Sequence, residues 1–288
     1  FAGAQKLADD IEAETDGRIT IDVFSNEQLS GGDSAKAVEG LAKGSIDLTF
    51  NSTIIYSILD ERFGVVSAPF LFDSLDEVDA AFAREGGKML DELLLEKNVV
   101  ALGYGENGFR QITNNEGPIE SPEDLKGMKM RIPGIKMYTD LFRAYGSDPA
   151  TMTWSEVFTA LQQGTIDGQE NPIDVIYSSK IDEVQDYLTL WNYSYDPLVL
   201  GINKKLFDSM SEEDQELFKR LGKEAAAYQI QLNRERAAEQ LEELKAKGMQ
   251  VNELTEEQLQ VFKDASQPIY DQYKTIWGED LLKAFQGE

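Results

Sequence analysis

The basic side chains that could bind an acid are few, and two of them stand in short apolar segments. The chain has 27 Lys and Arg against 53 Asp and Glu. Arg110 follows Phe109 in a β-forming segment, and Arg131 stands between Met130 and Ile132. A guanidinium presents a planar fork of N–H groups that can hold a carboxylate by two parallel hydrogen bonds. An arginine on a strand is more often an exposed surface residue, so these positions alone leave a binding role open.

Two other segments combine polar groups with an aromatic ring or a proline. Trp154 follows Thr153 at the start of a predicted helix, where it is either a core residue or a platform for a ligand. The segment 167–172 (Asp-Gly-Gln-Glu-Asn-Pro) is a polar turn when taken alone. Pro172 favours extended backbone at Asn171. Neither segment defines a site without a partner elsewhere in the chain.

The chain lacks the residues that several kinds of catalytic and metal chemistry require. The chain has no His and no Cys, so it offers no imidazole base, thiolate nucleophile or zinc–thiolate site, and we expect neither a metal nor a cofactor. The segment 103–108 matches Gly-x-Gly-x-x-Gly, but a strand and not a helix is predicted to follow it. We therefore predict a turn at Asn107-Gly108. The carboxylates leave a glycoside hydrolase as the enzymatic alternative.

The charge and the apolar runs limit the partners. A net charge of −26 disfavours binding to nucleic acid phosphates and to anionic lipid surfaces. The longest apolar runs, such as 65–72, are too short to span a bilayer. We expect a monomer without stable membrane insertion. Phe1 is an unusual native start, so we also expect a processed N-terminus.

Short strands alternate with helices along the chain. Periodicity and capping residues predict helices at 2–14, 33–43, from 74, from 122, 153–164, 211–247 and from 255. They predict strands at 18–24, 46–51, 98–105, 109–113, 128–132, 187–190 and 198–203. This alternation predicts an α/β protein with mainly parallel pairing. A helix over 211–247 is longer than one domain, so we expect two domains, with a chain that crosses between them more than once.

Taken together, these segments resemble the TRAP transporter substrate-binding proteins. The resemblance rests on 124–133 (Asp-Leu-Lys-Gly-Met-Lys-Met-Arg-Ile-Pro), 152–156 (Met-Thr-Trp-Ser-Glu) and 167–172. Shorter matches at Gly44–Asp47, Pro69–Phe72 and Phe109–Asn114 occur in the expected order. The resemblance implies a two-domain periplasmic-binding-protein fold with mixed sheets flanked by helices, hinge crossovers and one long bracing helix. We expect domain I at 1–107 and about 197–235, domain II at about 108–196 and 236–288, and a ligand cleft between them.

The resemblance also implies a site. It assigns the bidentate salt bridge with the ligand carboxylate to Arg131, assisting roles to Arg110 and Asn171, and packing on the ligand to Trp154. Four further residues match positions where some members place ligand-specific polar groups: Glu61, Asp47, Asn51 and Tyr193. The family begins with a strand and a loop that often touches ligand, so we expect part of the site to lie before this chain.

The function implied is capture of a small carboxylate ligand, a sugar acid, uronate or C4-dicarboxylate, by cleft closure. The partners implied are the TRAP transporter membrane subunits, and the location is the periplasm, after export by a signal peptide that this chain does not include. The chain would not be an enzyme. The alternatives are the carboxylate-based glycoside hydrolase and the binding protein of an ATP-driven importer.

Overall fold

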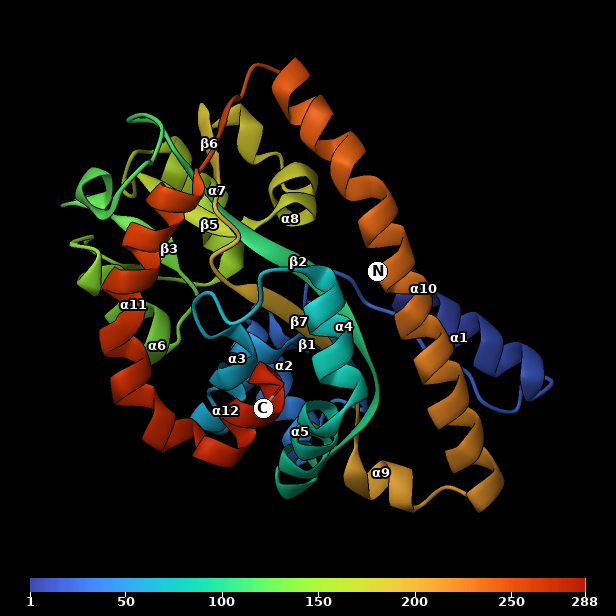
Figure 1. Ribbon diagram of the computed structural model, residues 1–288. Coiled ribbons are helices and arrows are strands. Elements are labelled where there is room, and N and C mark those ends of the chain that lie inside the picture. The colour runs from blue at the N-terminus through green and yellow to red at the C-terminus, as the bar shows by residue number, and fades with distance from the viewer. Residues whose placement is uncertain (288) are drawn as a thin grey trace.

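Two long strands, β2 and β7, run through the centre of one mixed sheet (Figure 1). The computed structural model describes residues 1–287. The sheet order is β1-β7-β2-β5-β3-β4, and β6 pairs with both β2 and β8. The strands are β1 (Leu48–Ser52), β2 (Val99–Asn114), β3 (Met130–Ile132), β4 (Ala150–Thr151), β5 (Gly168–Pro172), β6 (Tyr187–Leu190), β7 (Tyr195–Asn203) and β8 (Gln250–Glu253).

The pairing of the strands differs from the mainly parallel sheet predicted above. The pairs β1–β7, β2–β7, β2–β5 and β2–β6 are antiparallel, whereas β3–β4, β3–β5 and β6–β8 are parallel. The physical reason is that the two longest strands lie side by side and run in opposite directions. Each βα crossover therefore adds a parallel pair only toward the edges of the sheet.

The predicted turn at Asn107-Gly108 is wrong, because β2 passes through it without interruption. The register of β2 against β7 shifts between Glu106 and Gly108, which is the signature of a β-bulge. Gly108 has φ +102°, a backbone angle that favours glycine. The two strands predicted at 98–105 and 109–113 are thus one bulged strand. As predicted, no helix follows the Gly-x-Gly-x-x-Gly segment.

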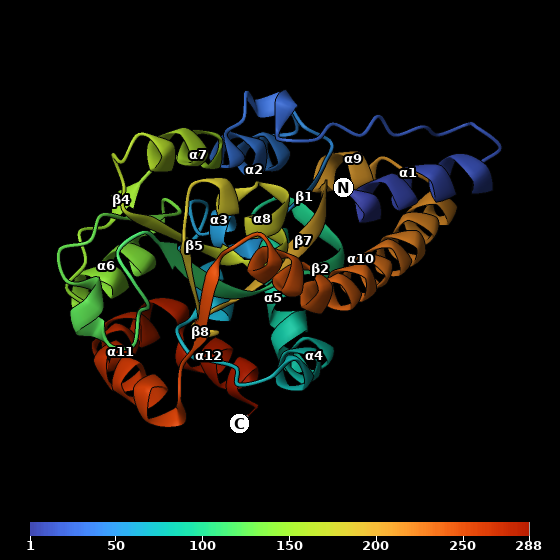
Figure 2. The ribbon, with the colours of Figure 1, turned by 90° about the horizontal axis from the view of Figure 1, so that it is seen from above.

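Helices cover both faces of the sheet, and the longest braces the whole molecule. The α-helices are α1 (Ala2–Glu14), α2 (Ser34–Lys43), α3 (Thr53–Tyr56), α4 (Leu75–Ala83), α5 (Glu85–Glu96), α6 (Lys136–Ala144), α7 (Trp154–Gln162), α8 (Ile173–Ser178), α9 (Lys204–Asp208), α10 (Glu212–Ala246), α11 (Glu256–Trp277) and α12 (Glu279–Gln286). Short 3-10 helices are η1 (Gln28–Ser30), η2 (Glu61–Ser67), η3 (Pro122–Leu125) and η4 (Ile181–Glu183). The 35 residues of α10 run along β2, with α1 packed at one end and α8 toward the other (Figures 1 and 2).

The bulge in β2 is held by α10. Gln229 accepts from the Glu106 main-chain N–H at 2.9 Å and donates to its carbonyl at 2.8 Å. The buried Glu106 carboxylate accepts from Arg234 Nη2 at 2.8 Å, and Arg234 also pairs with Asp79 of α4 at 2.7 Å. These contacts fix the middle of the long helix to the sheet where β2 changes partners.

The strand predicted at 18–24 is also wrong. The segment is irregular and has no strand partner, although Ile19 and Ile21 pack on the cluster of Leu7, Leu200 and Phe218. Alternating apolar residues can cover a core without a ladder of hydrogen bonds. A second and larger cluster lies under α3 to α6, α11 and α12, and a third lies between α7, α8 and the end of α10. Among residues 1–287, no helix is long and apolar enough to span a membrane.

Candidate ligand-binding site

Strand β5 brings the two arginines of interest to either side of one segment. The antiparallel register pairs Arg110 of β2 with Pro172, and the parallel register pairs Arg131 of β3 with Gln169. Arg110 is 3% exposed and Arg131 is 5% exposed, and within residues 1–287 they are the two buried basic side chains. Since an arginine is almost never fully buried unless it is paired, the partners of each guanidinium define its role.

All three nitrogens of the Arg110 guanidinium donate to the protein. Nη1 pairs with Asp196 Oδ2 at 2.6 Å, and Nη2 donates to Glu170 Oε1 at 2.9 Å. Nε pairs with Glu170 Oε2, and Nη2 also contacts the Glu170 carbonyl at 2.8 Å and Asn171 Oδ1 at 3.1 Å. Burial alone would lower the pKa of Arg110, but the two carboxylates hold it well above its usual value.

The two carboxylates that hold Arg110 have further donors of their own. Glu170 Oε2 accepts from the buried Tyr193 hydroxyl at 2.6 Å. Asp196 accepts from the Ser52 hydroxyl and from Asn107 Nδ2 at 3.2 Å. The result is a closed network of charges and donors, which joins the end of β1 to β2, β5 and β7.

Arg131 has no such network. Its Nε and Nη2 donate to the Met152 carbonyl at 3.2 and 2.8 Å, and its guanidinium carbon lies 5.3 Å from the centre of the Trp154 ring. Among residues 1–287, no carboxylate forms an ion pair with Arg131, and Nη1 donates to no protein atom. A buried charge with an unused donor is the arrangement expected where an anionic ligand completes the site.

The pKa of Arg131 is lowered because the buried guanidinium has no carboxylate partner among residues 1–287. Burial lowers this pKa to about 10, Glu170 opposes the change, and the positive charge of Arg110 adds to it. The guanidinium therefore remains protonated at neutral pH, in surroundings that favour the arrival of a negative charge.

Asn171 lies against Arg110, and Trp154 lies against Arg131. Asn171 accepts from Arg110 and donates from Nδ2 to Gln169 Oε1 at 2.8 Å, and the Asn171 side chain is buried. Trp154 is the first residue of α7 and is half-buried with its ring over Arg131.

The remaining predicted residues are placed differently. Tyr193 is buried behind Glu170, and Asn51, next to Ser52 in β1, is half-buried. Asp47 is exposed, and its main-chain carbonyl accepts from the Asn203 N–H at 2.9 Å. None of these three contacts Arg131 directly, and their ligand contacts stay predictions.

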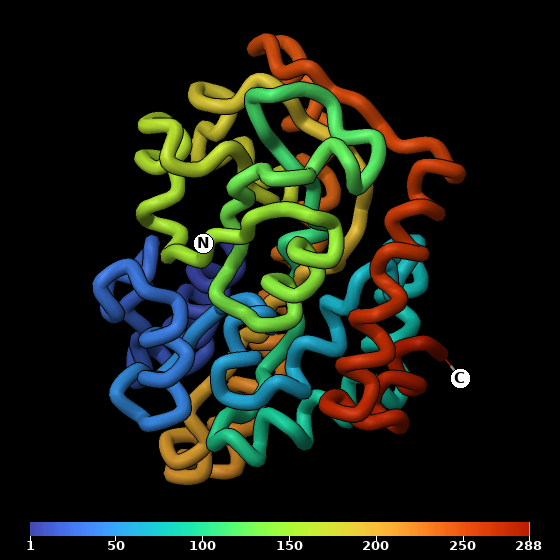
Figure 3. Tube along the Cα trace, turned by 90° about the vertical axis from the view of Figure 1, so that its left-hand side faces the viewer, coloured from blue at the N-terminus to red at the C-terminus, as the bar shows by residue number. Residues whose placement is uncertain are grey.

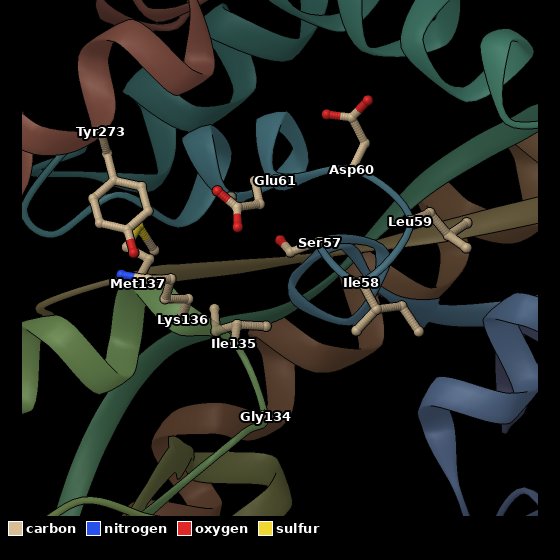
Figure 4. Close-up of a pocket in the computed structure, with 11 residues that line it drawn as sticks. Ser57, Ile58, Leu59, Asp60, Glu61, Gly134, Ile135, Lys136, Met137 and Tyr273 are labelled. Carbon is tan, nitrogen blue, oxygen red and sulfur yellow. The ribbon is translucent and has the colours of Figure 1, made fainter.

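Glu61 lines a cavity of about 360 Å³ between η2, the β3–α6 connection and α11 (Figure 4). Glu61 and Ser57 line one side of it, and Lys136 and Tyr273 line the other. The Lys136 and Tyr273 groups are both bound to Asp140. Arg131, Arg110, Asn171 and Trp154 do not line this cavity.

A direct contact joins the start of α7 to the segment before α2. Ser155 Oγ lies 3.4 Å from the Gly32 carbonyl, and α7 and α2 lie side by side in two views (Figures 2 and 3). Gly32 has φ +80°, and Gly31 has φ +70°. With these elements in contact, Arg131 is 5% exposed.

Sequence reasoning missed Glu170 and Asp196, which decide what Arg110 can do. Glu170 lies inside the 167–172 motif, but a carboxylate within a polar segment is not distinguishable from a surface residue by type alone. Asp196 lies 86 residues from Arg110, so no local spacing relates the two.

The mixed sheet crossed by two long strands, braced by one long helix and holding a buried unpaired arginine, defines a binding protein of the periplasmic type. The family described as bacterial extracellular solute-binding protein, family 7 (DctP) matches residues 1–276. The chain belongs to this family, the solute-binding proteins of TRAP transporters.

Individual relatives support this family assignment. The 2,3-diketo-L-gulonate-binding periplasmic protein YiaO of Escherichia coli is 33% identical over 98% of this chain and 85% of its own length. The C4-dicarboxylate-binding protein DctB of Bacillus subtilis is 30% identical over 97% of this chain and 80% of its own length. A TRAP periplasmic solute-binding protein from Ralstonia eutropha H16, solved with (S)-2-acetolactate, superposes with a TM-score of 0.96 at 34% identity. That superposition covers 99% of this chain and 92% of the solved one.

These similarities confirm the predicted family and the α/β periplasmic-binding-protein fold, with its mixed sheet and its long helix. They also confirm that the chain is a solute-binding protein rather than an enzyme, which removes the glycoside hydrolase alternative. Membership of the TRAP family likewise excludes the alternative of a binding protein of an ATP-driven importer.

Proposed function

We propose that this protein is the extracytoplasmic receptor of a TRAP transporter, and that it captures a small organic acid through a salt bridge to Arg131. The observation that supports this most is the buried guanidinium without a carboxylate partner among residues 1–287. An uncompensated buried charge costs several kcal/mol, roughly the cost of breaking a buried ion pair, ~3–5 kcal/mol. A ligand carboxylate at Nη1 removes that cost, so the charge that weakens the free protein provides the binding energy.

The other side chains complete the site around this salt bridge. Trp154 covers one face of the Arg131 guanidinium and offers its ring edge to the ligand. Asn171 has a second Nδ2 hydrogen beyond the one given to Gln169, and it can donate to a ligand oxygen. Asp47, Asn51 and Glu61 are assigned weaker, ligand-specific roles, and Tyr193 acts through Glu170.

Ligand access requires the two domains to separate. The proposed domain I comprises 1–107 and about 197–235, and the proposed domain II comprises about 108–196 and 236–288. The Ser155–Gly32 contact joins these parts across the cleft and opens when the domains part. A ligand that bridges the two parts favours the closed state, because it contacts both only there. The closed receptor then delivers its acid to the membrane subunits.

The relatives support both the class of ligand and the location. YiaO and DctB are described as binding a keto sugar acid and C4-dicarboxylates, and YiaO is described as periplasmic. The Ralstonia structure holds a hydroxy-keto acid. A receptor for a small acid fits all three relatives and the unpaired Arg131, and the periplasmic location follows YiaO and the Ralstonia protein.

The experiment is a thermal-shift screen followed by titration calorimetry. The panel contains aldonates, uronates, keto acids, hydroxy acids and dicarboxylates, and the best acid is titrated into the wild type, Arg131→Ala and Lys129→Ala. Lys129 is exposed, two residues away on the same segment, and serves as the matched control. We expect Arg131→Ala to lose about 3–5 kcal/mol of binding, and Lys129→Ala to bind like the wild type. Unchanged affinity in Arg131→Ala contradicts the proposed function.

A further inference from the structure

The number of available positive charges limits the number of carboxylates that the ligand can carry. Within residues 1–287 the buried basic side chains are Arg110 and Arg131. Lys136, the basic residue that lines the cavity of Figure 4, is exposed and paired with Asp140 at 2.5 Å. Within this part of the chain, a buried ligand carboxylate therefore has two candidate cations, Arg110 and Arg131.

Arg110 cannot serve as that partner without a large loss. Both of its carboxylates, Glu170 and Asp196, are as buried as Arg110 itself, at 0% and 1% exposure. Each of the three guanidinium nitrogens donates to one of these two residues, and Nη2 also contacts Asn171. Turning the guanidinium toward a ligand breaks its ion pairs with these buried carboxylates, which costs several kcal/mol.

The surroundings of Arg110 also repel a second carboxylate. One positive charge there faces two negative charges, so the group as a whole has a charge of −1. The Tyr193, Ser52 and Asn107 donors already serve Glu170 and Asp196. A neutral hydroxyl or carbonyl of a ligand meets no such repulsion, and a hydroxyl can donate to the surplus acceptors.

We propose that the ligand is a monocarboxylate whose other polar groups are uncharged hydroxyls or carbonyls, and that C4-dicarboxylates and aldarates are rejected. This inference rests on the proposed function, because it takes Arg131 as the partner of the single carboxylate. The Arg110–Glu170–Asp196 network then determines specificity by leaving the ligand one cation rather than two.

Matched pairs of acids test the inference directly. Each pair shares its carbon chain and differs only where a terminal CH₃ or CH₂OH is replaced by a carboxylate: 2-hydroxybutyrate and malate, threonate and tartrate, galactonate and galactarate. Titration calorimetry at neutral pH and about 0.15 M salt gives the affinity ratio within each pair. We expect the monocarboxylate of the best-binding pair to bind at least ~100-fold more tightly than its dicarboxylate. A dicarboxylate that binds as tightly as its partner, or more tightly, overturns the inference.

The variant Asp196→Asn tests whether charge, and not the shape of the site, determines the preference for a monocarboxylate. In Asp196→Asn the amide oxygen can still accept from Arg110, and the amide nitrogen can donate to the Ser52 hydroxyl, so the packing is retained. We expect the affinity ratio to shift by at least ~10-fold toward the dicarboxylate, with the fold verified by its thermal transition. An unchanged ratio in the folded variant contradicts the charge argument.

The two proposals fail in different ways. A dicarboxylate that binds tightly to the wild type and loses that affinity in Arg131→Ala overturns the monocarboxylate inference and upholds the role of Arg131. Binding of either kind of acid that survives Arg131→Ala, or no binding by any acid of the pairs, contradicts the proposed function itself.

Discussion

Arg110 and Arg131 have the same burial and flank the same strand, yet they have opposite surroundings. Arg110 lies among two carboxylates, an amide and a main-chain carbonyl, whereas Arg131 has one carbonyl and the face of an indole ring. The comparison shows that burial alone does not identify a binding residue. A paired buried charge is part of the scaffold, and an unpaired one indicates a missing partner.

The largest expected effect concerns stability. Arg110→Met leaves Glu170 and Asp196 buried without their cation, so we expect the free energy of unfolding to fall by about 3–5 kcal/mol. Urea unfolding monitored by circular dichroism measures it. The matched control is Arg131→Met, which removes a buried charge that has no carboxylate partner, so its free energy of unfolding should not fall below that of the wild type. Equal losses of unfolding free energy in the two variants would contradict the proposed difference between the two arginines.

The next effect concerns the geometry of the Arg131 group. Arg131→Lys keeps the positive charge but loses the planar fork, so we expect binding of the cognate acid to weaken by about 1.5–3 kcal/mol. Titration calorimetry gives the value, and Lys129→Arg, an exposed exchange of the same two residue types, should leave it unchanged. Wild-type affinity in Arg131→Lys would mean that a point charge is sufficient.

Trp154 provides a smaller effect and an optical readout. Trp191 and Trp277 are buried in the core, whereas Trp154 is half-buried over Arg131, so its emission should dominate the change on ligand binding. We expect Trp154→Phe to remove most of the fluorescence change and to weaken binding by less than about 1.5 kcal/mol. A fluorescence change of wild-type size in this variant contradicts the contact between Trp154 and the ligand.

The smallest expected effect on binding is that of salt. Salt should act on the repulsion between surface carboxylates and leave the buried site almost unchanged. The net charge of −26 is carried mostly by exposed carboxylates, and their mutual repulsion is screened by salt. We expect the free energy of unfolding to rise between low salt and about 0.5 M NaCl, while the affinity at the buried Arg131 changes less than about threefold. A steep loss of affinity with salt would place the ligand at an exposed cation instead.

The sequence predicted the elements with strong local causes and missed those set by distant partners. The predicted helices at 2–14 and 211–247 correspond to α1 and α10, because apolar periodicity and a Ser211 cap suffice to define them. The 18–24 strand failed because no strand was available to pair with it. The turn at Asn107-Gly108 failed because β7 offers a ladder long enough to absorb a bulge.

The site shows the same contrast between features with local causes and features set by distant partners. The motifs around Arg131, Trp154 and Asn171 are local, and the structure places Trp154 against Arg131 and Asn171 against Arg110. The difference between the two arginines could not be predicted, since it depends on Asp196, which approaches Arg110 only through the pairing of β2 with β7.

The central claim is that Arg131 pairs with the carboxylate of the ligand, and one thermodynamic cycle tests it most directly. The best acid from the screen and its primary amide are each titrated into the wild type and Arg131→Ala. We predict that the wild type prefers the acid to the amide by at least about 2 kcal/mol more than Arg131→Ala does, because the coupling exists only when both charges are present. An acid-to-amide preference that is the same in both proteins would contradict the claim.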